Sequence, residues 1–429
     1  MEPRPYIASF FKTLAAFIAF GLVVLAPYGW WFIAKSGDVD LQGVVREQAA
    51  GRFAIFGSGV SQDFVDYKLE LYSAVKPDII VLGSSRVMQF RGKYFTRKFL
   101  NIGGTAGNLA VLRSTIEAML KVHTPETVIL GLDFWWFTQK WEADPFKEVP
   151  PTSGTYAYSF DVLKTPYEWL LEGKLTPGQF FAPLTGAFEK HLYGIMAQKT
   201  GDGFATDGSW YYTADVTGQQ HPFDYQFQDT LKQVRRGIKA FAAAPEISAA
   251  HVDALAEILC KLQSRGVRTH LFITPLSQAV YDAMREREKD YPQMFRLAGS
   301  LHARDIEVQD YSDPRTLKST DCEFVDGFHG GDVTYARILR ALADKHPSLV
   351  QHVDILKLDE DIHYYNGFAM APDERVTRLS EIDFMNFQCR KERAAAPEFA
   401  RPPAPVAAPA AAPRAPGSKA PARTPGKKR

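Results

Sequence analysis

The chain is poor in cysteine and has no excess of charge of either sign. Its 429 residues include only Cys260, Cys322 and Cys389, which are widely spaced and form no Cys-x-x-Cys pair. Neither a zinc knuckle nor a disulfide framework can therefore be argued from the sequence. Fifty Lys and Arg residues face 49 Asp and Glu residues, a balance that does not favour general nucleic-acid binding. The 46% of hydrophobic residues is ordinary globular usage and excludes a wholly disordered or fibrous protein.

Long hydrophobic runs are scarce too, and the one that stands out lies near the N-terminus. Residues 14–34 carry no charge and are flanked by Lys12 and Lys35. This length suits a membrane core of about 30 Å and exceeds the usual apolar part of a signal peptide. A cleaved signal is the competing interpretation, but no A-x-A-like site follows the run. We expect an uncleaved single-pass anchor in the inner membrane, with aromatic residues at one interface: Tyr28, Trp30 and Trp31.

The positive charges at the N-terminus favour an inside orientation for the first residues, although Lys35 weakens the bias. The rest of the chain is then expected to face the periplasm or exterior. The predicted parts are a cytoplasmic segment 1–13, an anchor 14–34, a juxtamembrane linker 35–74, a folded domain 75–345 with an insertion at about 138–245, a C-terminal extension 346–396 and a tail 397–429.

The tail is rich in Pro and Ala, and its basic residues outnumber its single acid, Glu398. Such a composition cannot bury enough apolar surface to offset its ordering entropy, so we expect disorder. The tail is interpreted either as a solvated spacer or as a contact for an anionic polymer or lipid head groups.

Short apolar runs alternate with helical patterns in the folded domain, which predicts a parallel sheet built from βαβ units. We expect an α/β fold with three α/β/α layers around a central parallel sheet. The predicted strands are residues 78–82, 99–102, 127–132, 269–273 and 306–309, and the predicted helices are residues 108–122, 248–265, 277–303 and 332–343.

The alternation breaks after about residue 138, where a long stretch without clear periodicity is dense in aromatic residues. A segment of this length within a compact domain is typical of a functional insertion, such as a lid or groove wall. Its aromatic rings are suited to stacking on sugars, but a satellite hydrophobic cluster that holds the insertion together explains them equally well.

Ligands bind at the carboxyl ends of strands in an open parallel sheet, so the strand ends are where chemistry is expected. Ser84 and Ser85 follow the first strand directly, and Gly103 follows the second. Far downstream, Asp326 and His329 have a spacing that places both on one side of a helical turn. A hydroxyl needs a neighbouring base to become a nucleophile, and a carboxylate orients such a base. These residues predict a Ser85, His329 and Asp326 triad.

The motifs around these residues resemble those of the SGNH/GDSL hydrolase superfamily, which has a flavodoxin-like fold. Gly83-Ser84-Ser85 is similar to its first block, Asn101 to Gly104 to its second, and Asp326 to His329 to its terminal D-x-x-H block. The resemblance implies Ser85 as nucleophile and the N–H groups of Ser85 and Gly103 as oxyanion donors. It covers about residues 75–345 and leaves the insertion unmatched.

The third block of the superfamily usually reads G-x-N-D, but this chain has Asp133 where the oxyanion-binding Asn is expected. A carboxylate there repels an oxyanion unless it is protonated or turned away. Asn108 can supply the missing amide or cap the following helix. Arg86 can clamp an anionic polymer or form a surface ion pair. The residues expected near the substrate are Arg86, Asn108, Asp133, Trp135 and Trp136.

A Ser-Ser variant with one N-terminal anchor resembles the SGNH-like proteins of alginate O-acetylation and D-alanylation. The resemblance implies transfer or removal of an acyl ester, such as acetyl, on a cell-envelope polysaccharide, with a membrane-bound O-acyltransferase as a possible partner. A catalytically weak scaffold for that partner is the alternative, and phosphate-ester chemistry at the Ser85 turn is a third possibility. No cofactor and no metal is implied.

Overall fold

The computed structural model describes residues 4–60, 64–150, 160–244, 246–376 and 379–394. They belong to one compact unit that ends at Ala394. The predicted Pro/Ala-rich tail, residues 397–429, lies outside the described residues.

The unit is built on a five-stranded, fully parallel sheet whose spatial order is β3-β2-β4-β8-β9. If these five strands are renumbered 1 to 5 along the chain, their order in the sheet is 2-1-3-4-5. The chain moves from β2 to β3 on one side and then returns past β2 to β4 on the other, so the direction of winding reverses between β2 and β4. The predicted α/β class with a parallel sheet is therefore confirmed. The bounds are β2 (Ile79–Leu82), β3 (Phe99–Asn101), β4 (Thr127–Leu132), β8 (Arg268–Ile273) and β9 (Gln309–Asp310).

Both faces of this sheet are covered, which explains why its strands are nearly continuous apolar runs. Successive side chains of a strand point to opposite faces, so Ile80 and Leu82 join one hydrophobic core while Ile79 and Val81 join the other. The first core is completed by α4 (Val65–Val75), α5 (Leu109–Val122) and α12 (Ala249–Ser264), and the second by α16 (Asp332–Lys345), α17 (Pro347–Val350) and α18 (Ile355–Tyr364).

The expected helix at 277–303 is broken in the structure. It is divided into α13 (Gln278–Arg285), α14 (Pro292–Phe295) and α15 (Leu297–His302). Pro292 opens α14, where its missing N–H costs no helical hydrogen bond, whereas inside one continuous helix it would remove one. The fifth strand also begins later than predicted, at Gln309.

The juxtamembrane segment is folded and does not form the expected linker. It contains α3 (Leu41–Ala49), β1 (Ile55–Phe56) and all of α4 except its last residue, and its buried side chains join the first core, which also holds Ile80 and Leu82. β1 belongs to a second sheet of order β5-β1-β6-β7, whose other strands come from the insertion: β5 (Leu192–Tyr193), β6 (Gly203–Phe204) and β7 (Trp210–Tyr211).

The described part of the insertion is structured as well, since it also holds several short helices. Strands of two residues are too short to show alternation in a sequence, which explains why this stretch looked loop-like. The helices are α6 (Phe160–Leu171), α7 (Pro177–Phe180), α8 (Ala182–Thr185), α9 (Ile195–Thr200), α10 (Thr213–Val216) and α11 (Gln228–Arg236).

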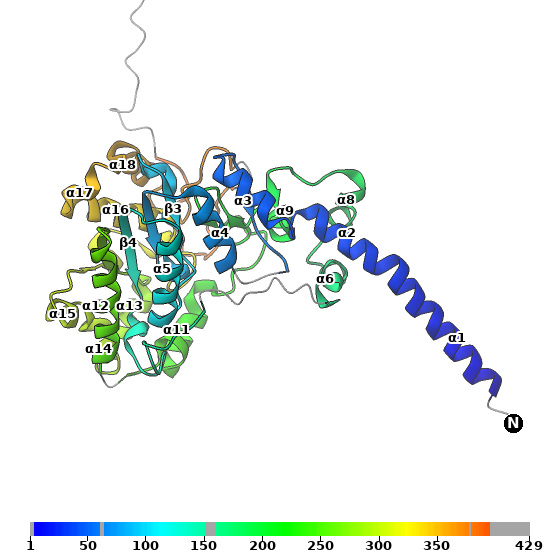
Figure 1. The fold of residues 1–429 in the computed structure, drawn as a ribbon, viewed down its shortest axis with the longest axis horizontal. Coiled ribbons are helices and arrows are strands. Elements are labelled where there is room, and N and C mark those ends of the chain that lie inside the picture. Colours follow the sequence, from blue (N-terminus) through cyan, green and yellow to red (C-terminus); the bar gives the residue numbers. More distant parts are fainter. Residues whose placement is uncertain (1–3, 61–63, 151–159, 245, 377–378, 395–429) are drawn as a thin grey trace, which may run out of the picture. The chain divides into compact units, whose positions relative to one another are not determined.

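One N-terminal helix is long and apolar enough to cross a membrane. It runs through α1 (Arg4–Phe20), a π-helical turn (Gly21–Leu25) and α2 (Ala26–Ser36), and it projects from the rest of the unit in Figure 1. Only its first part is bare. Phe32 and Ile33 in α2 are buried by the insertion, so one face of the last part of the anchor expected at 14–34 is covered by protein, while Trp30 is still 45% exposed.

The C-terminal extension continues past α18 as an irregular chain that is tied back by a disulfide. Cys322 and Cys389 are joined, with their sulfur atoms 2.01 Å apart, and Cys260 is free and exposed. The sequence offered no argument for this bridge because its two cysteines are 67 positions apart and belong to no recognisable pattern.

Candidate active site

A tight turn after β2 presents Ser85 at the carboxyl end of the sheet. Gly83 has φ +151°, a conformation that L side chains rarely adopt, and a β-carbon there would lie 2.9 Å from the carbonyl oxygen of Gly131. Ser84 then caps the short 3-10 helix Ser85–Val87 by accepting a hydrogen bond from the Arg86 N–H. Ser85 is thus the first helical residue and is only partly buried.

The three residues predicted as a triad meet at this turn. The distance from Ser85 Oγ to His329 Nε2 is 2.8 Å, and the distance from His329 Nδ1 to Asp326 Oδ2 is 2.6 Å. One ring nitrogen of His329 therefore faces the hydroxyl while the other faces the carboxylate. This is the geometry of a base that is held in one tautomer and can accept the hydroxyl proton.

Asp326 is held in its ionised form. Burial by itself would raise the pKa of its carboxyl group, but the adjacent His329 ring and several hydrogen bonds outweigh burial and leave the pKa below its ordinary value. Two of these bonds come from backbone: the N–H groups of Phe328 and His329 donate to Asp326 Oδ1 at 2.9 and 2.7 Å. The carboxylate thus orients both its own loop and the imidazole.

The loop that carries Asp326 and His329 is braced from three directions. Asp224 Oδ2, from the insertion, accepts a hydrogen bond of 2.9 Å from the Gly327 N–H, and the N–H of Ser277 donates to the Gly327 carbonyl at 3.1 Å. Arg86 Nε donates to the Phe328 carbonyl at 2.8 Å. Sequence reasoning missed Asp224, because it lies in the stretch without periodicity and belongs to no motif.

The sequence suggested that Arg86 clamps a polymer or forms a surface ion pair. The structure contradicts both interpretations. Its side chain is completely buried and forms an ion pair with the equally buried Asp133 at 3.1 Å. Its remaining donors bind the carbonyls of Phe328 and Pro275. Asp133 also accepts a 2.9 Å bond from Thr274 Oγ1. Its carboxylate is therefore turned inward and paired, and it contributes neither to substrate binding nor to the expected repulsion of an oxyanion.

The oxyanion role expected for Gly103 is not available in this arrangement. The Gly103 N–H donates to Asn101 Oδ1 at 2.8 Å, and the Gly104 N–H donates to the carbonyls of Gly83 and Ser84. The first N–H groups of a helix have no acceptor within that helix. The N–H of Ser85, at the start of its 3-10 helix, is therefore the remaining donor of the expected pair.

Three other predicted residues divide between structural and lining roles. Asn108 caps α5, because its Oδ1 accepts a 2.9 Å hydrogen bond from the Val111 N–H. Trp136 is fully buried in the first core and has no access to a substrate. Trp135 lies at the cavity beside Ser85, with the Arg86 guanidinium 5.2 Å from its ring centroid. Of the two tryptophans, only Trp135 remains a candidate contact.

A cavity of about 490 Å³ opens beside the nucleophile candidate. Its lining includes Ser84, Ser85, Gly104 and Asp326. The insertion supplies about half of the lining, with both aromatic and polar side chains: Trp141, Phe223, Asp224, Asp229, Thr230, Gln233, Lys239 and Ala240. The insertion thus forms a groove wall at this point, while other aromatic residues of the insertion pack into the cores.

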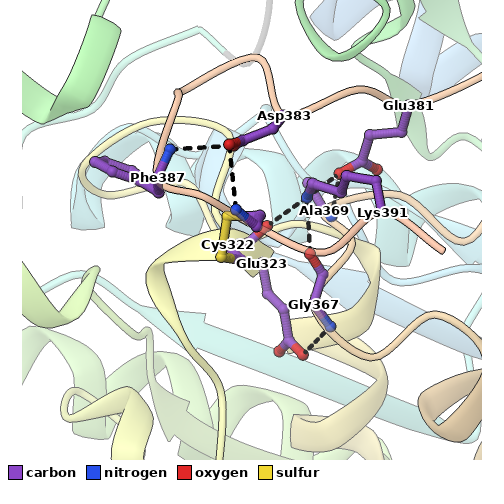
Figure 2. Close-up of a disulfide and its surroundings, with 9 residues drawn as sticks. Cys322, Glu323, Gly367, Ala369, Glu381, Asp383, Phe387 and Lys391 are labelled. Atoms are coloured by element: carbon purple, nitrogen blue, oxygen red, sulfur yellow. Dashed lines mark hydrogen bonds and ion pairs between the residues drawn. A yellow bond between two sulfur atoms is a disulfide. The ribbon is translucent and has the colours of Figure 1, made fainter.

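The C-terminal extension holds both ends of the Asp326–His329 loop. The disulfide attaches Cys389 to Cys322, four positions before Asp326, and Lys391 Nζ donates to the Cys322 carbonyl at 3.1 Å (Figure 2). After the loop, Gly331 packs so closely on the extension that a β-carbon there would collide with the Ala369 carbonyl. The extension is therefore part of the support of the site.

The structure brings Ser85, His329 and Asp326 together and leaves Trp135 at the same cavity. The other predicted site residues have structural roles: Gly103, Arg86, Asn108, Asp133 and Trp136. No protein-family model matches the chain, and no curated protein matches it. The chemistry of the site therefore rests on its own geometry.

Proposed function

We propose that this protein is a membrane-anchored enzyme that transfers or removes an acyl ester, such as acetyl, on a cell-envelope polysaccharide. The observation that carries the proposal is the continuous contact from the Ser85 hydroxyl through His329 to Asp326, with distances of 2.8 and 2.6 Å. A hydroxyl, an imidazole and a carboxylate in this order form the working unit of serine acyl transfer on several unrelated folds.

In the first half-reaction, Ser85 Oγ attacks the carbonyl carbon of the donor ester while its proton passes to His329 Nε2. Asp326 stabilises the imidazolium that forms. The tetrahedral intermediate collapses when the bond to the leaving alkoxide breaks, and His329 returns its proton to that oxygen. The acyl group is then bound to Ser85 and the donor leaves as an alcohol.

In the second half-reaction, an acceptor hydroxyl gives its proton to His329 Nε2 and attacks the acyl carbon. Cleavage of the bond to Ser85 Oγ, with return of the proton to that oxygen, restores the enzyme. A sugar hydroxyl as acceptor gives acyl transfer, whereas water gives hydrolysis. The cavity wall, with Trp141 and Phe223 beside Asp229 and Gln233, offers rings for stacking on sugar faces and polar groups for their hydroxyls.

The fold supports assignment to the SGNH-like, flavodoxin-like class. A sheet order of 2-1-3-4-5 with helices on both faces is that of doubly wound folds, in which ligands bind beyond the carboxyl ends of the strands. Ser85 follows β2 at this edge. The position of the serine therefore agrees with the motif resemblance.

The disulfide supports an extracytoplasmic location. Bridges such as Cys322–Cys389 persist in oxidising compartments, including the bacterial periplasm, and are rare in the cytosol. With one N-terminal helix in the inner membrane, the folded unit then faces the periplasm, where envelope polysaccharides and a membrane-bound O-acyltransferase partner are accessible.

A catalytically weak scaffold for such an acyltransferase is the second candidate. It is favoured by the committed N–H groups of Gly103 and Gly104, which leave few preformed donors for an oxyanion. The inward orientation of Asp133 favours the enzyme instead, because it removes the repulsion of an oxyanion that the sequence predicted.

The test is acyl labelling of the full chain in detergent with p-nitrophenyl acetate, followed by mass analysis of the labelled peptide. We expect one acetyl group on the Ser85 peptide of the wild type and none in Ser85→Ala. Ser84→Ala is the matched control, because Ser84 lines the same cavity but caps the turn; it should still be labelled. Equal labelling of wild type and Ser85→Ala would refute the nucleophile assignment, and no labelling of either would favour the scaffold.

A second test addresses the acceptor. Acyl-ester content of the envelope polysaccharide is measured in cells that carry the wild type, Ser85→Ala or Ser84→Ala. Loss of esters only in Ser85→Ala supports transfer, and an increase supports removal. Unchanged content in all three would contradict the proposed acceptor class.

A further inference from the structure

The helix that leaves the folded unit is exposed on all its faces only over its first two-thirds, and beyond that one face is covered by protein. Between Tyr6 and Leu25 its large apolar side chains are 40–84% exposed, and at about 1.5 Å per residue this stretch is long enough for a hydrocarbon core of about 30 Å. Phe32 and Ile33, farther along, are 1% and 0% exposed because the insertion covers them. If residues 6–25 span the hydrocarbon core, the edge of that core nearest to the folded unit lies at the π-helical turn, Gly21–Leu25.

The insertion touches the helix at this same level. We call α6, α7 and α8 the collar; α6 and α8 contact α2 and lie on either side of it in Figure 1. Tyr167 of α6 donates its hydroxyl to the Leu25 carbonyl at 2.6 Å, and Tyr28 donates to the Phe180 carbonyl at 2.6 Å. A β-carbon at Gly29 would collide with the Leu163 carbonyl, so Gly29 allows the backbones of α2 and α6 to touch.

The collar carries three large apolar side chains that remain about half or more exposed in the described chain. Leu171 at the end of α6 is 87% exposed, Leu184 in α8 is 61% exposed, and Phe181 between α7 and α8 is 47% exposed. Single exposed apolar side chains are ordinary on a protein surface, but three within fourteen positions of one segment point to contact with another apolar medium. Since the collar grips the helix where it leaves the bilayer, the surface nearest to these side chains is the membrane itself.

We propose that the collar lies in the outer interface of the lipid bilayer, with Leu171, Phe181 and Leu184 inserted into the boundary between head groups and acyl chains. The occupant of this apolar surface is lipid, and the contact continues the lipid-exposed surface of α1. The protein then has two membrane contacts, a spanning helix and an interfacial one, which hold the folded unit at a set height. This inference does not depend on the chemistry at Ser85.

The charges of the collar indicate which kind of lipid contact this is. Lys164 is paired with Glu168 and Lys174 with Glu172, so each of these basic side chains has an acidic neighbour and the pairs carry no net charge. An interfacial helix that binds through apolar side chains needs no anionic lipid, whereas one that binds through basic side chains does. The contact is therefore apolar and independent of lipid charge.

The test is depth-dependent quenching in vesicles that contain the purified full chain. On a Cys260→Ser background, single cysteines at Leu171, Phe181 and Leu184 are labelled without reductant with an environment-sensitive fluorophore, which leaves the Cys322–Cys389 disulfide intact. Phosphatidylcholine vesicles contain a spin-labelled phosphatidylcholine as quencher. Phe17→Cys in α1 is the reference for a lipid-facing site, and Leu356→Cys, 75% exposed in α18 and distant from α2 in Figure 1, is the reference for water.

We expect quenching at the three collar positions to exceed that at position 356 by about twofold or more, with a blue-shifted emission. The effect should be equal in vesicles with and without phosphatidylglycerol. Collar labels that behave like the label at position 356, while the label at position 17 is quenched, would overturn the proposal and would indicate a protein partner on this surface. Quenching that requires phosphatidylglycerol would overturn its apolar character.

Discussion

The buried pair Arg86–Asp133 offers a quantitative test of how the site is held. Both side chains are 0% exposed, and Arg86 also binds the carbonyls of Phe328 and Pro275. In Asp133→Asn the neutral amide keeps the shape of the side chain and its Thr274 partner, but the guanidinium loses the one anion that pairs with it among the described residues. Removing one partner of a buried pair costs about 3–5 kcal/mol, and Arg86→Met should cost a similar amount because it leaves the carboxylate unpaired.

The double variant Arg86→Met/Asp133→Asn has no buried charge. Its remaining defect is the pair of carbonyls that lose the guanidinium, at about 1–3 kcal/mol each. We therefore expect the double variant to lose about 2–6 kcal/mol, less than the sum of the two single variants, which is about 6–10 kcal/mol. The difference is the coupling energy of the pair.

The assay is urea denaturation of the full chain in detergent, with tryptophan fluorescence as the measure of unfolding. The wild type, the two single variants and the double variant are also tested for acyl labelling of Ser85. Labelling should fall in both variants that lack Arg86, because Arg86 holds the carbonyl of Phe328, the residue next to His329. If the single effects add to within about 0.5 kcal/mol in the double variant, the two side chains do not interact and the buried-pair reasoning is refuted.

Three further predictions address the supports of the triad. Replacing both Cys322 and Cys389 by Ala should lower the free energy of unfolding by about 4 kcal/mol, from the closed loop of 67 positions, with Cys260→Ser unchanged as the control in the same denaturation assay. Gly83→Ala should cost about 1–3 kcal/mol, since its φ of +151° is strained for alanine, and should slow labelling at the adjacent turn in kinetic assays. The pKa of Asp326 is lowered in the folded protein, so its ionised carboxylate stabilises the fold above about pH 4, and this stabilisation is lost as the pH falls through the folded-state pKa. The difference in free energy of unfolding between the wild type and Asp326→Asn should therefore decrease below about pH 4 in denaturation experiments at a series of pH values. A difference that stays constant with pH would contradict this prediction.

The parts of the fold that the sequence predicts well are those whose packing is repetitive. β4 was expected at its observed bounds, Thr127–Leu132, because six consecutive residues are buried on both faces of the sheet. The insertion was not predictable in this way. β1 pairs with β5, and Ile55 lies opposite Leu192, so the pairing depends on contacts that leave no local pattern. The burial of α2 beneath α6 has the same cause.

The sequence contains a sign that the Gly103 N–H is not a free oxyanion donor, and a comparison of motifs does not reveal it. Asn101 precedes Gly103 by two positions, and Asn side chains commonly accept a hydrogen bond from the N–H two residues further on. The structure has this bond at 2.8 Å. A glycine in a resembling motif therefore supplies a free N–H only where no such neighbour competes for it.

Arg86 and Asp133 were misread for a different reason, because each was considered alone. Arg86 follows β2 and Asp133 follows β4, and these strands are adjacent and parallel, with Leu82 opposite Leu130. Arg86 comes four positions after the end of β2 and Asp133 comes immediately after β4, so both lie beyond the same edge of the sheet, where opposite charges can pair. Considered together, the arginine and the aspartate predict the buried pair, and the carboxylate that departs from the resembling motif is explained by the cation beside it.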